Sequence, residues 1–518
     1  MRQGLLPFEY RHDRSQAGAT AVAGLLPFLE LACVAELAGS IETHVQVCSE
    51  HQGWTDSQMV LSLICLNLAG GACVDDLRIL ESDPGFGRVW RQLEAYGVSS
   101  SERTALEARF RKGRVRNLPS ASAVFRFLSG FHDEAQDAQR VAGQAFIPRP
   151  TDGLRGLSLV NRDLLSFVQS RRPHQTATLD MDATLVETWK RDALQSYKGF
   201  RAYQPMNVYW AEQEALLYSE FRDGNVPAGH EQKRVLQEAL EHLPEGGQRV
   251  RLRSDTAGYQ HDLLRWCASG ESERFGVIEF AVGCDVTQEF RRAVGQIEEK
   301  EWHPIFEQFD GRRLATGREW AKVPLFVPTN TARSKSDPDY WYLATREALK
   351  QQPLAGVQEQ LDLREQLNLP FQAMSMLTDG HPIYYKIFGT VTNLPWSGDR
   401  VIQWLQQRCG KSEEVHAVQK EDMAGGILPS TAFGANAAWW GVMVLAYNLN
   451  TVMKHLVLGD GWVKKRMKAL RFGLIQMAGV MVQHAGSLNV KLRIPQKAFD
   501  HLLDIRRKIV ELALPALA

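Results

Sequence analysis

The stretch Thr178-Leu-Asp-Met-Asp-Ala-Thr184 decides the fold class predicted for this chain. Polar and apolar residues alternate along it, so Asp180 and Asp182 share one face of a predicted β-strand while Leu179 and Met181 point to the other. Burying two carboxylates without a counter-charge is expensive, so a cation or a basic partner is expected beside them. The stretch therefore predicts a sheet strand with a candidate cation site on its polar face.

The segments that follow predict the rest of this sheet. Two strands flank a turn at 212–214, and a helix, a strand, a second helix and a last strand come after them; the predicted ranges are 206–210, 215–222, 233–243, 249–254, 260–268 and 274–282. Three strands, helix, strand, helix, strand is the order of a ribonuclease H-like α/β sheet. In that arrangement Asp255, just after the fourth strand, lies beside the first strand and Asp182. Asp255 also has a simpler interpretation as a helix cap.

The remaining segments predict several further regions. Residues 284–400 contain strand-like runs among Pro and Gly breakers, which indicates a mainly β insertion between the two parts of the core. We expect the following organisation: an irregular arm at 1–20, a helical region at 21–150, the core at 170–283 and 401–450 around the insertion, and a basic, helical C-terminal region at 451–518. Within the last of these, 463–478 is expected to be helical and 489–493 strand-like.

Composition limits the function classes. The formal net charge is zero, but residues 451–508 hold twelve basic side chains against three acidic ones, which is a plausible phosphate-facing surface. The seven cysteines are scattered without a C-x-x-C pair, which argues against a disulfide framework or a zinc site. The N-terminus lacks the apolar core of a signal peptide, and the most apolar stretch, 437–458, is interrupted by polar residues. We therefore expect no membrane partner and a cytoplasmic location.

A third acidic residue lies in the stretch Arg408-Cys-Gly-Lys-Ser-Glu-Glu-Val-His-Ala-Val-Gln-Lys420. Glu413 and Lys420 are two helical turns apart and share a face, so the lysine can contact a phosphate while the glutamate binds a cation. Glu414 is the alternative, but the same spacing leads from it to another glutamate. Asp182, Asp255 and Glu413 together are expected to hold a pair of divalent cations for cutting a phosphodiester, Mg²⁺ with Mn²⁺ as a substitute.

Several motifs of this chain resemble those of DDE transposases of bacterial insertion sequences, in the branch with a β-strand insertion. The motifs are Leu179-Asp-Met-Asp-Ala-Thr184, Lys198-Gly-Phe-Arg-Ala-Tyr-Gln-Pro205, Arg253-Ser-Asp-Thr-Ala-Gly-Tyr259, and Gly425–Asn436 with Leu445–Leu449. The resemblance covers roughly residues 20–495. It implies Asp182 rather than Asp180 as the first ligand, Asp255 and Glu413 as the others, and cut-and-paste DNA transposition. The chain departs from the family where Gln406 and Cys409 replace an expected Tyr and Arg, and Arg408 stands one position early.

The resemblance also implies the partners: the terminal inverted repeats of an element, a target DNA and a homodimer on paired ends, in a bacterial cytoplasm beside the nucleoid. The helical region at 21–150 is expected to be the DNA-binding domain that recognises the terminal repeats. The residues expected to contact DNA are Lys420, Arg408, Lys198, Arg126 in this helical region, and Lys464, Lys465 and Arg466 in the basic region. Tryptophans 302, 320, 341 and 396 of the insertion are candidates to hold a flipped base. The alternatives are a metal-dependent nuclease without strand transfer and an inactive derivative that only binds DNA.

Overall fold

A large mixed sheet forms the centre of the protein in a computed structural model that describes residues 18–246, 249–324, 340–349, 373–378, 381–484 and 487–513. The strand β2 (Thr176–Ala183) pairs antiparallel with β5 (Met206–Trp210), which pairs antiparallel with β6 (Ala215–Glu220). On its other side β2 is parallel to β7 (Arg249–Ser254), and β7 is parallel to β8 (Glu279–Cys284). This order, β6-β5-β2-β7-β8, is the ribonuclease H-like arrangement that the sequence predicted.

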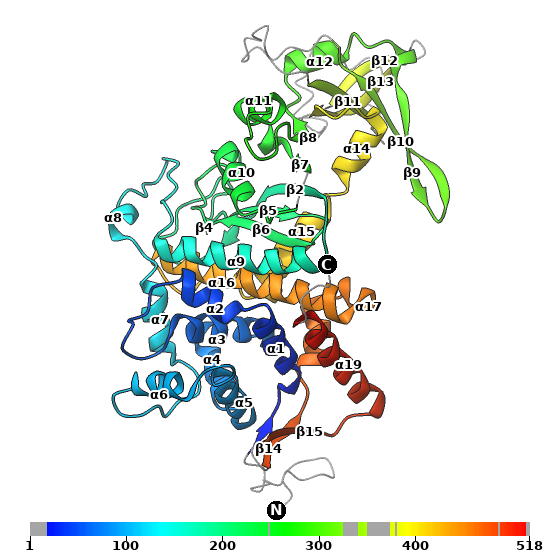
Figure 1. Ribbon diagram of the computed structural model, residues 1–518. Coiled ribbons are helices and arrows are strands. Elements are labelled where there is room, and N and C mark those ends of the chain that lie inside the picture. Colours follow the sequence, from blue (N-terminus) through cyan, green and yellow to red (C-terminus); the bar gives the residue numbers. More distant parts are fainter. Residues whose placement is uncertain are drawn as a thin grey trace, which may run out of the picture.

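Helices cover both faces of this sheet (Figure 1). The apolar side of β2 packs with the helices α10 (Gln232–Glu241) and α11 (His261–Ser269) in one buried cluster. The opposite side packs against α9 (Asp152–Arg171) and α16 (Phe433–Val452). Because Asp180 lies directly across from Tyr209, which is buried with α16, the acidic face of β2 is the one turned toward α16.

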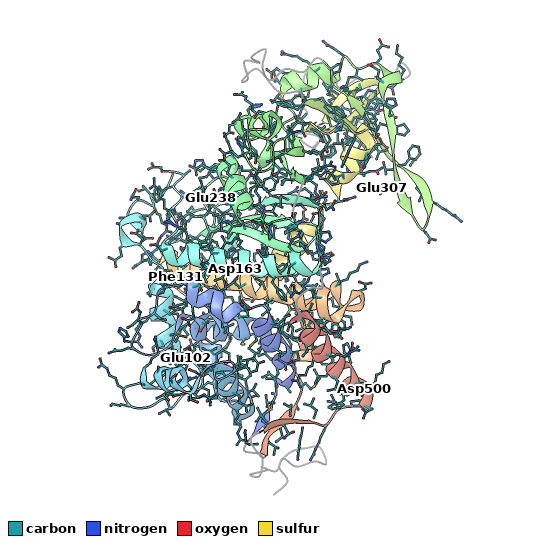
Figure 2. The ribbon with its side chains drawn as sticks, in the orientation of Figure 1. Glu102, Phe131, Asp163, Glu238, Glu307 and Asp500 are labelled. Atoms are coloured by element: carbon teal, nitrogen blue, oxygen red, sulfur yellow. The ribbon has the colours of Figure 1, made fainter. Side chains whose placement is uncertain are left out.

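The predicted insertion does not form a separate sheet. Its strands continue the core sheet because β13 pairs antiparallel with β8, which gives the order β8-β13-β11-β10-β9. Figure 1 shows the β9–β10 hairpin reaching out from this end, and Figure 2 labels Glu307 on it. The elements are β9 (His303–Phe309), β10 (Arg312–Lys322), β11 (Trp341–Ala348), β12 (Ala373–Thr378), β13 (His381–Thr392), α12 (Gln288–Val294) and α14 (Gly398–Gln406). The expected strand at 323–327 lies largely outside the described residues.

The N-terminal region is helical, as predicted, but it shares one hydrophobic core with α16 and the C-terminal region. Its helices are α1 (Leu26–Val34), α2 (Leu37–His44), α3 (Asp56–Ala69), α4 (Leu77–Glu81), α5 (Pro84–Glu94), α6 (Ser100–Ala108), α7 (Ala121–Ser129) and α8 (Glu134–Asp137). Asp163 of α9, labelled in Figure 2, contacts two side chains of α2. It accepts a hydrogen bond from Ser40 Oγ at 2.7 Å, and its carboxylate lies 2.9 Å from His44 Nε2. These contacts fasten the helical region to the helix that supports the sheet.

The C-terminal region corrects one prediction. Residues 463–478 do not form one helix but the short helices α17 (Asp460–Val463) and α18 (Met467–Leu470) followed by a π-helical turn. Arg471 donates from this turn to the carbonyl oxygens of Leu68 (3.0 Å) and Asn67 (2.7 Å), a tertiary anchor that local periodicity does not register. The strands β14 (Gly479–His484) and β15 (Ser487–Leu492) pair, and α19 (Gln496–Ala513) ends the described chain.

The predicted arm at 1–20 is also corrected at its end. Residues 1–17 lie outside the described residues, but β1 (Ala19–Thr20) pairs antiparallel with β14. None of the helices within the described ranges is long and apolar enough by itself to cross a membrane, and the bent pairs 23–44 and 56–81 meet that requirement only when each is counted as one span.

Candidate active site

The two aspartates of β2 have different partners, although they share a face. Asp180 is 3% exposed and accepts two hydrogen bonds from Arg253 of β7, from Nε at 2.6 Å and from Nη2 at 2.8 Å. Arg253 is 4% exposed and also donates from Nη1 to the carbonyl oxygen of Trp404 in α14 at 2.9 Å. Asp180 is therefore a structural anion with its counter-charge built in, and the pair ties β2 and β7 to α14.

Asp182, at the end of the same strand, lacks such a partner on β7. It instead forms an ion pair with Arg408, whose Nη2 lies 3.1 Å from Asp182 Oδ2. Burial raises the pKa of Asp182 to about 6; Arg408 works against this rise, and the negative charges of Asp255 and Glu413 add to it. Asp255 and Glu413 therefore both act electrostatically on Asp182, as expected if the three carboxylates face a common region.

Asp255 follows β7 and is solvent-exposed. Its Oδ1 accepts a hydrogen bond from the backbone N–H of Ala257 at 2.9 Å, so it also caps the short helix η3 (Thr256–Gly258), as the simpler interpretation expected. Asp255 and Arg408 line a common open cavity of about 520 Å³, to which Arg318 contributes a second guanidinium. An acid facing two guanidinium groups across such a space suits the binding of a phosphodiester beside a cation.

Glu413 lies in the first turn of α15 (Lys411–Ala417) and is exposed. Its Oε2 accepts a hydrogen bond from the backbone N–H of Gly410 at 2.7 Å. Glu414 instead lines a different pocket together with Tyr447 and Lys454, and its carboxylate lies 3.7 Å from Lys411 Nζ. Glu413, not its neighbour, is among the charges that raise the pKa of Asp182.

The donor set fits a divalent cation in its chemistry. The carboxylates of Asp182, Asp255 and Glu413 are hard oxygen ligands, and the pKa of Asp182 is raised first by burial and then by the negative charges of Asp255 and Glu413, against the effect of Arg408. Within the described ranges, however, no three His, Cys, Asp or Glu side chains are spaced closely enough to hold a metal ion. Glu413 and Asp255 are occupied as helix-end acceptors, and both are exposed.

The predicted phosphate-contacting lysines lie near each other. Lys420 belongs to the π-helical turn η5 (Val418–Asp422), and its Nζ donates to the carbonyl oxygen of Leu185 at 3.3 Å. Burial lowers the pKa of Lys420; Glu421 opposes this effect, and the positive charge of Lys198 adds to it. His416, between Glu413 and Lys420, has its pKa lowered to about 4, first by burial and then by Lys420, and is neutral at pH 7.

The other predicted DNA contacts lie on outer surfaces. Arg126 is exposed on α7, and its Nε donates to the carbonyl oxygen of Ser122 at 3.3 Å. Arg466 lies beside the turn that carries Lys420, where its Nε pairs with Asp422 at 2.9 Å. Lys464 and Lys465 are exposed, and Lys465 Nζ lies 3.9 Å from the ring centroid of Trp462.

Sequence reasoning missed the roles of Arg253 and Arg318. Arg253 was part of a recognised motif, but no role was assigned to it. The signal that identifies its role is the strand register, because Asp180 lies directly opposite Arg253 in the β2–β7 ladder. Arg318 lies in β10 and gave no signal, since only the folded sheet brings it to α14, where its Nη2 donates to Gln406 Oε1 at 3.3 Å.

Comparisons with known proteins identify the family to which this chain belongs. A solved structure described as a piggyBac transposase synaptic complex with hairpin DNA aligns over 97% of this chain and 88% of that chain, with a TM-score of 0.41 and 11% identity. A search of curated protein sequences found no match. The family model described as "Transposase DDE domain group 1" matches residues 15–321, a range that includes Asp182 and Asp255 and ends before Glu413. Because this match spans more than half of the chain, the protein belongs to the family of transposases with a group 1 DDE domain.

Proposed function

We propose that this protein is a metal-dependent cut-and-paste DNA transposase, which cleaves strands at the ends of an element and joins them to a target DNA. The observation that carries the proposal is the electrostatic coupling of Asp182 to Asp255 and Glu413 at the end of a ribonuclease H-like sheet. Membership of the DDE transposase family supports the same reaction class. The finer points, strand transfer and the identity of the cation as Mg²⁺ or Mn²⁺, belong to the proposal.

The side chains divide into two roles. Asp182, Asp255 and Glu413 would hold a pair of divalent cations, which supply activation of the attacking oxygen and stabilisation of the leaving oxygen. Lys420 and Lys198, whose positive charges act on each other, would neutralise phosphates that do not react.

Arg408 forms an ion pair with Asp182 and has N–H groups without a hydrogen-bond acceptor among the described residues. It is 8% exposed, and neither its Nε nor its Nη2 makes a hydrogen bond with any described residue, although Nη2 lies 3.1 Å from Asp182. Unpaired guanidinium donors at the wall of the cavity are suited to a phosphate oxygen of the substrate.

The tryptophans of the inserted strands support a contact with DNA bases. Trp320, Trp341 and Trp396 line an open cavity of about 690 Å³ together with Lys300 and Lys322. Indole faces next to ammonium groups suit a base with its phosphate, so this cavity is proposed to hold a base displaced at the element end.

Trp302, the fourth predicted tryptophan, has another role. It is 6% exposed, and the guanidinium of Arg346 lies 4.3 Å from its ring centroid, so it serves the core of this region.

One reaction tests the proposal and separates the alternatives. The protein is incubated with Mg²⁺, DNA that carries the element ends and a supercoiled target, and joined products are expected. Cut ends without joined products would indicate a nuclease, and no cleavage at all would indicate a derivative that only binds DNA. Asp182→Ala should abolish cleavage and retain end binding, whereas Asp262→Ala, at an exposed position of α11, should change neither.

A further inference from the structure

A short hairpin leaves the core sheet directly after the candidate ligand Asp182. Its arms are β3 (Val186–Glu187) and β4 (Ala202–Tyr203), which pair antiparallel, and residues 186–203 are called the β3–β4 hairpin below. At its base, Lys420 Nζ donates to the carbonyl oxygen of Leu185 at 3.3 Å. The hairpin therefore stands between the end of β2 and the turn that carries the predicted phosphate-binding lysine.

The hairpin is held by its own backbone. Three hydrogen bonds cross it: Thr188 N–H to Arg201 O at 3.0 Å, Ala202 N–H to Leu194 O at 3.1 Å, and Ser196 N–H to Phe200 O at 2.8 Å. Gly199, with φ of +84°, closes the tip. The fold thus fixes where the hairpin presents its outer side chains.

Two of those outer side chains are aromatic and uncovered. Trp189 is 94% exposed and Tyr197 is 76% exposed. All thirteen tryptophans lie in the described part of the chain, and Trp189 is the only one of them that is exposed. Single exposed apolar residues are common, but two large aromatic side chains on one rigid hairpin beside a catalytic site indicate a surface that a ligand covers.

The charges around these rings favour a polyanion. The hairpin carries four basic residues (Lys190, Arg191, Lys198 and Arg201) against two acidic ones (Glu187 and Asp192). Arg191 Nε lies 3.1 Å from Asp192 Oδ1, but both side chains are exposed, and such ion pairs contribute little. The ammonium of Lys198 lies 5.8 Å from the ring centroid of Tyr197.

Aromatic faces interleaved with cations form the kind of surface that binds unpaired nucleic acid. A protein-binding surface would instead be depleted of lysine at its centre.

We propose that the β3–β4 hairpin is a stacking platform for unpaired DNA, on which Trp189 and Tyr197 take bases while Lys198 and Lys420 take phosphates. This inference rests on the proposed function, because the strand released by cleavage beside Asp182 is the source of the unpaired DNA. It adds a substrate element, a single strand next to the cut, that the cation site alone does not define.

Binding of a fluorescein-labelled oligo(dT) strand of about 12 nucleotides, measured by anisotropy in EDTA, tests the platform. Trp189→Ala and Tyr197→Ala should each weaken this binding by about tenfold or more, and leave binding of a duplex of equal length within about twofold. Trp189→Phe should keep most of the affinity because a ring remains. Tyr96→Ala, which removes a ring that is 77% exposed at a distant position, is the matched control and should change nothing.

Two results would overturn the platform. One is unchanged oligo(dT) affinity in the double variant of Trp189 and Tyr197 with an unchanged melting temperature. The other is a loss of self-association in sedimentation with the single-strand affinity retained, which would make the hairpin a contact between copies of this chain. The cleavage assay with Asp182→Ala separates the two proposals. Persistent cleavage refutes the proposed function, whereas Asp182-dependent cleavage without stacking refutes the platform alone.

Discussion

The raised pKa of Asp182 predicts an unusual dependence of stability on pH. Its pKa rises from the ordinary 3.8 to about 6 in the folded protein, chiefly because of burial. A carboxyl with a raised folded pKa contributes stability that is complete below the unfolded pKa and is lost as pH rises through the folded pKa. The protein without metal should therefore lose stability between pH 4 and pH 6, and Asp182→Asn should remove this part of the loss.

The magnitude follows from the two pKa values. The full difference of about two units corresponds to about 3 kcal/mol, and the part that falls between pH 5 and pH 7.5 is about 1.4 kcal/mol. Comparing the pH dependence of wild type and variant is safer than comparing their stabilities at one pH, because Asp182→Asn also leaves Arg408 without its anion. That loss shifts the free energy of unfolding of the variant by a similar amount at every pH. It hardly changes how steeply this free energy depends on pH.

Urea unfolding in EDTA at several pH values between 5 and 7.5 measures how the free energy of unfolding depends on pH. Added Mg²⁺ should stabilise wild type by about 2.7 kcal/mol when its free concentration is a hundred times Kd, and more weakly at low pH, because the ligands must be deprotonated. Asp262→Asn, at an exposed helix position, should keep the wild-type slope. Parallel curves for wild type and Asp182→Asn in EDTA would refute the reasoning.

Three further predictions concern the surroundings of the site. Arg253→Met should cost about 3–5 kcal/mol of stability, because it leaves Asp180 buried without a counter-charge. The double variant with Asp180→Leu should recover most of this stability in urea unfolding. A double variant no more stable than Arg253→Met would contradict this account. Glu413→Gln should lower the rate of strand cleavage by about a hundredfold or more, whereas Glu414→Gln should leave it roughly unchanged, as measured on a nicked end substrate. Lys420→Gln should weaken duplex binding and reduce the slope of log affinity against log salt by about one, and an unaltered slope would remove this lysine from the phosphate contacts.

The sequence predicted the central sheet well where the pattern of polar and apolar residues within one segment decides the structure. The alternation in 178–184 and the order of the following elements predicted a five-stranded arrangement that the structure confirms. The pattern was less informative where packing between distant segments decides. Residues 463–478 have a helical pattern, yet contacts such as that of Arg471 with the carbonyl oxygen of Leu68 break them into short pieces. The strands of the insertion were foreseen, but not their continuation of the core sheet through β13 and β8.

By itself the sequence determined that two aspartates share one face of β2, because side-chain direction in a strand depends only on whether a position is odd or even. It did not determine which of the two is structurally paired. That choice comes from the β2–β7 register, which sets Arg253 against Asp180 and leaves Asp182 to Arg408, Asp255 and Glu413. Register and helix packing join residues that are far apart along the chain, so the charge around a buried carboxylate is a property of the tertiary structure alone.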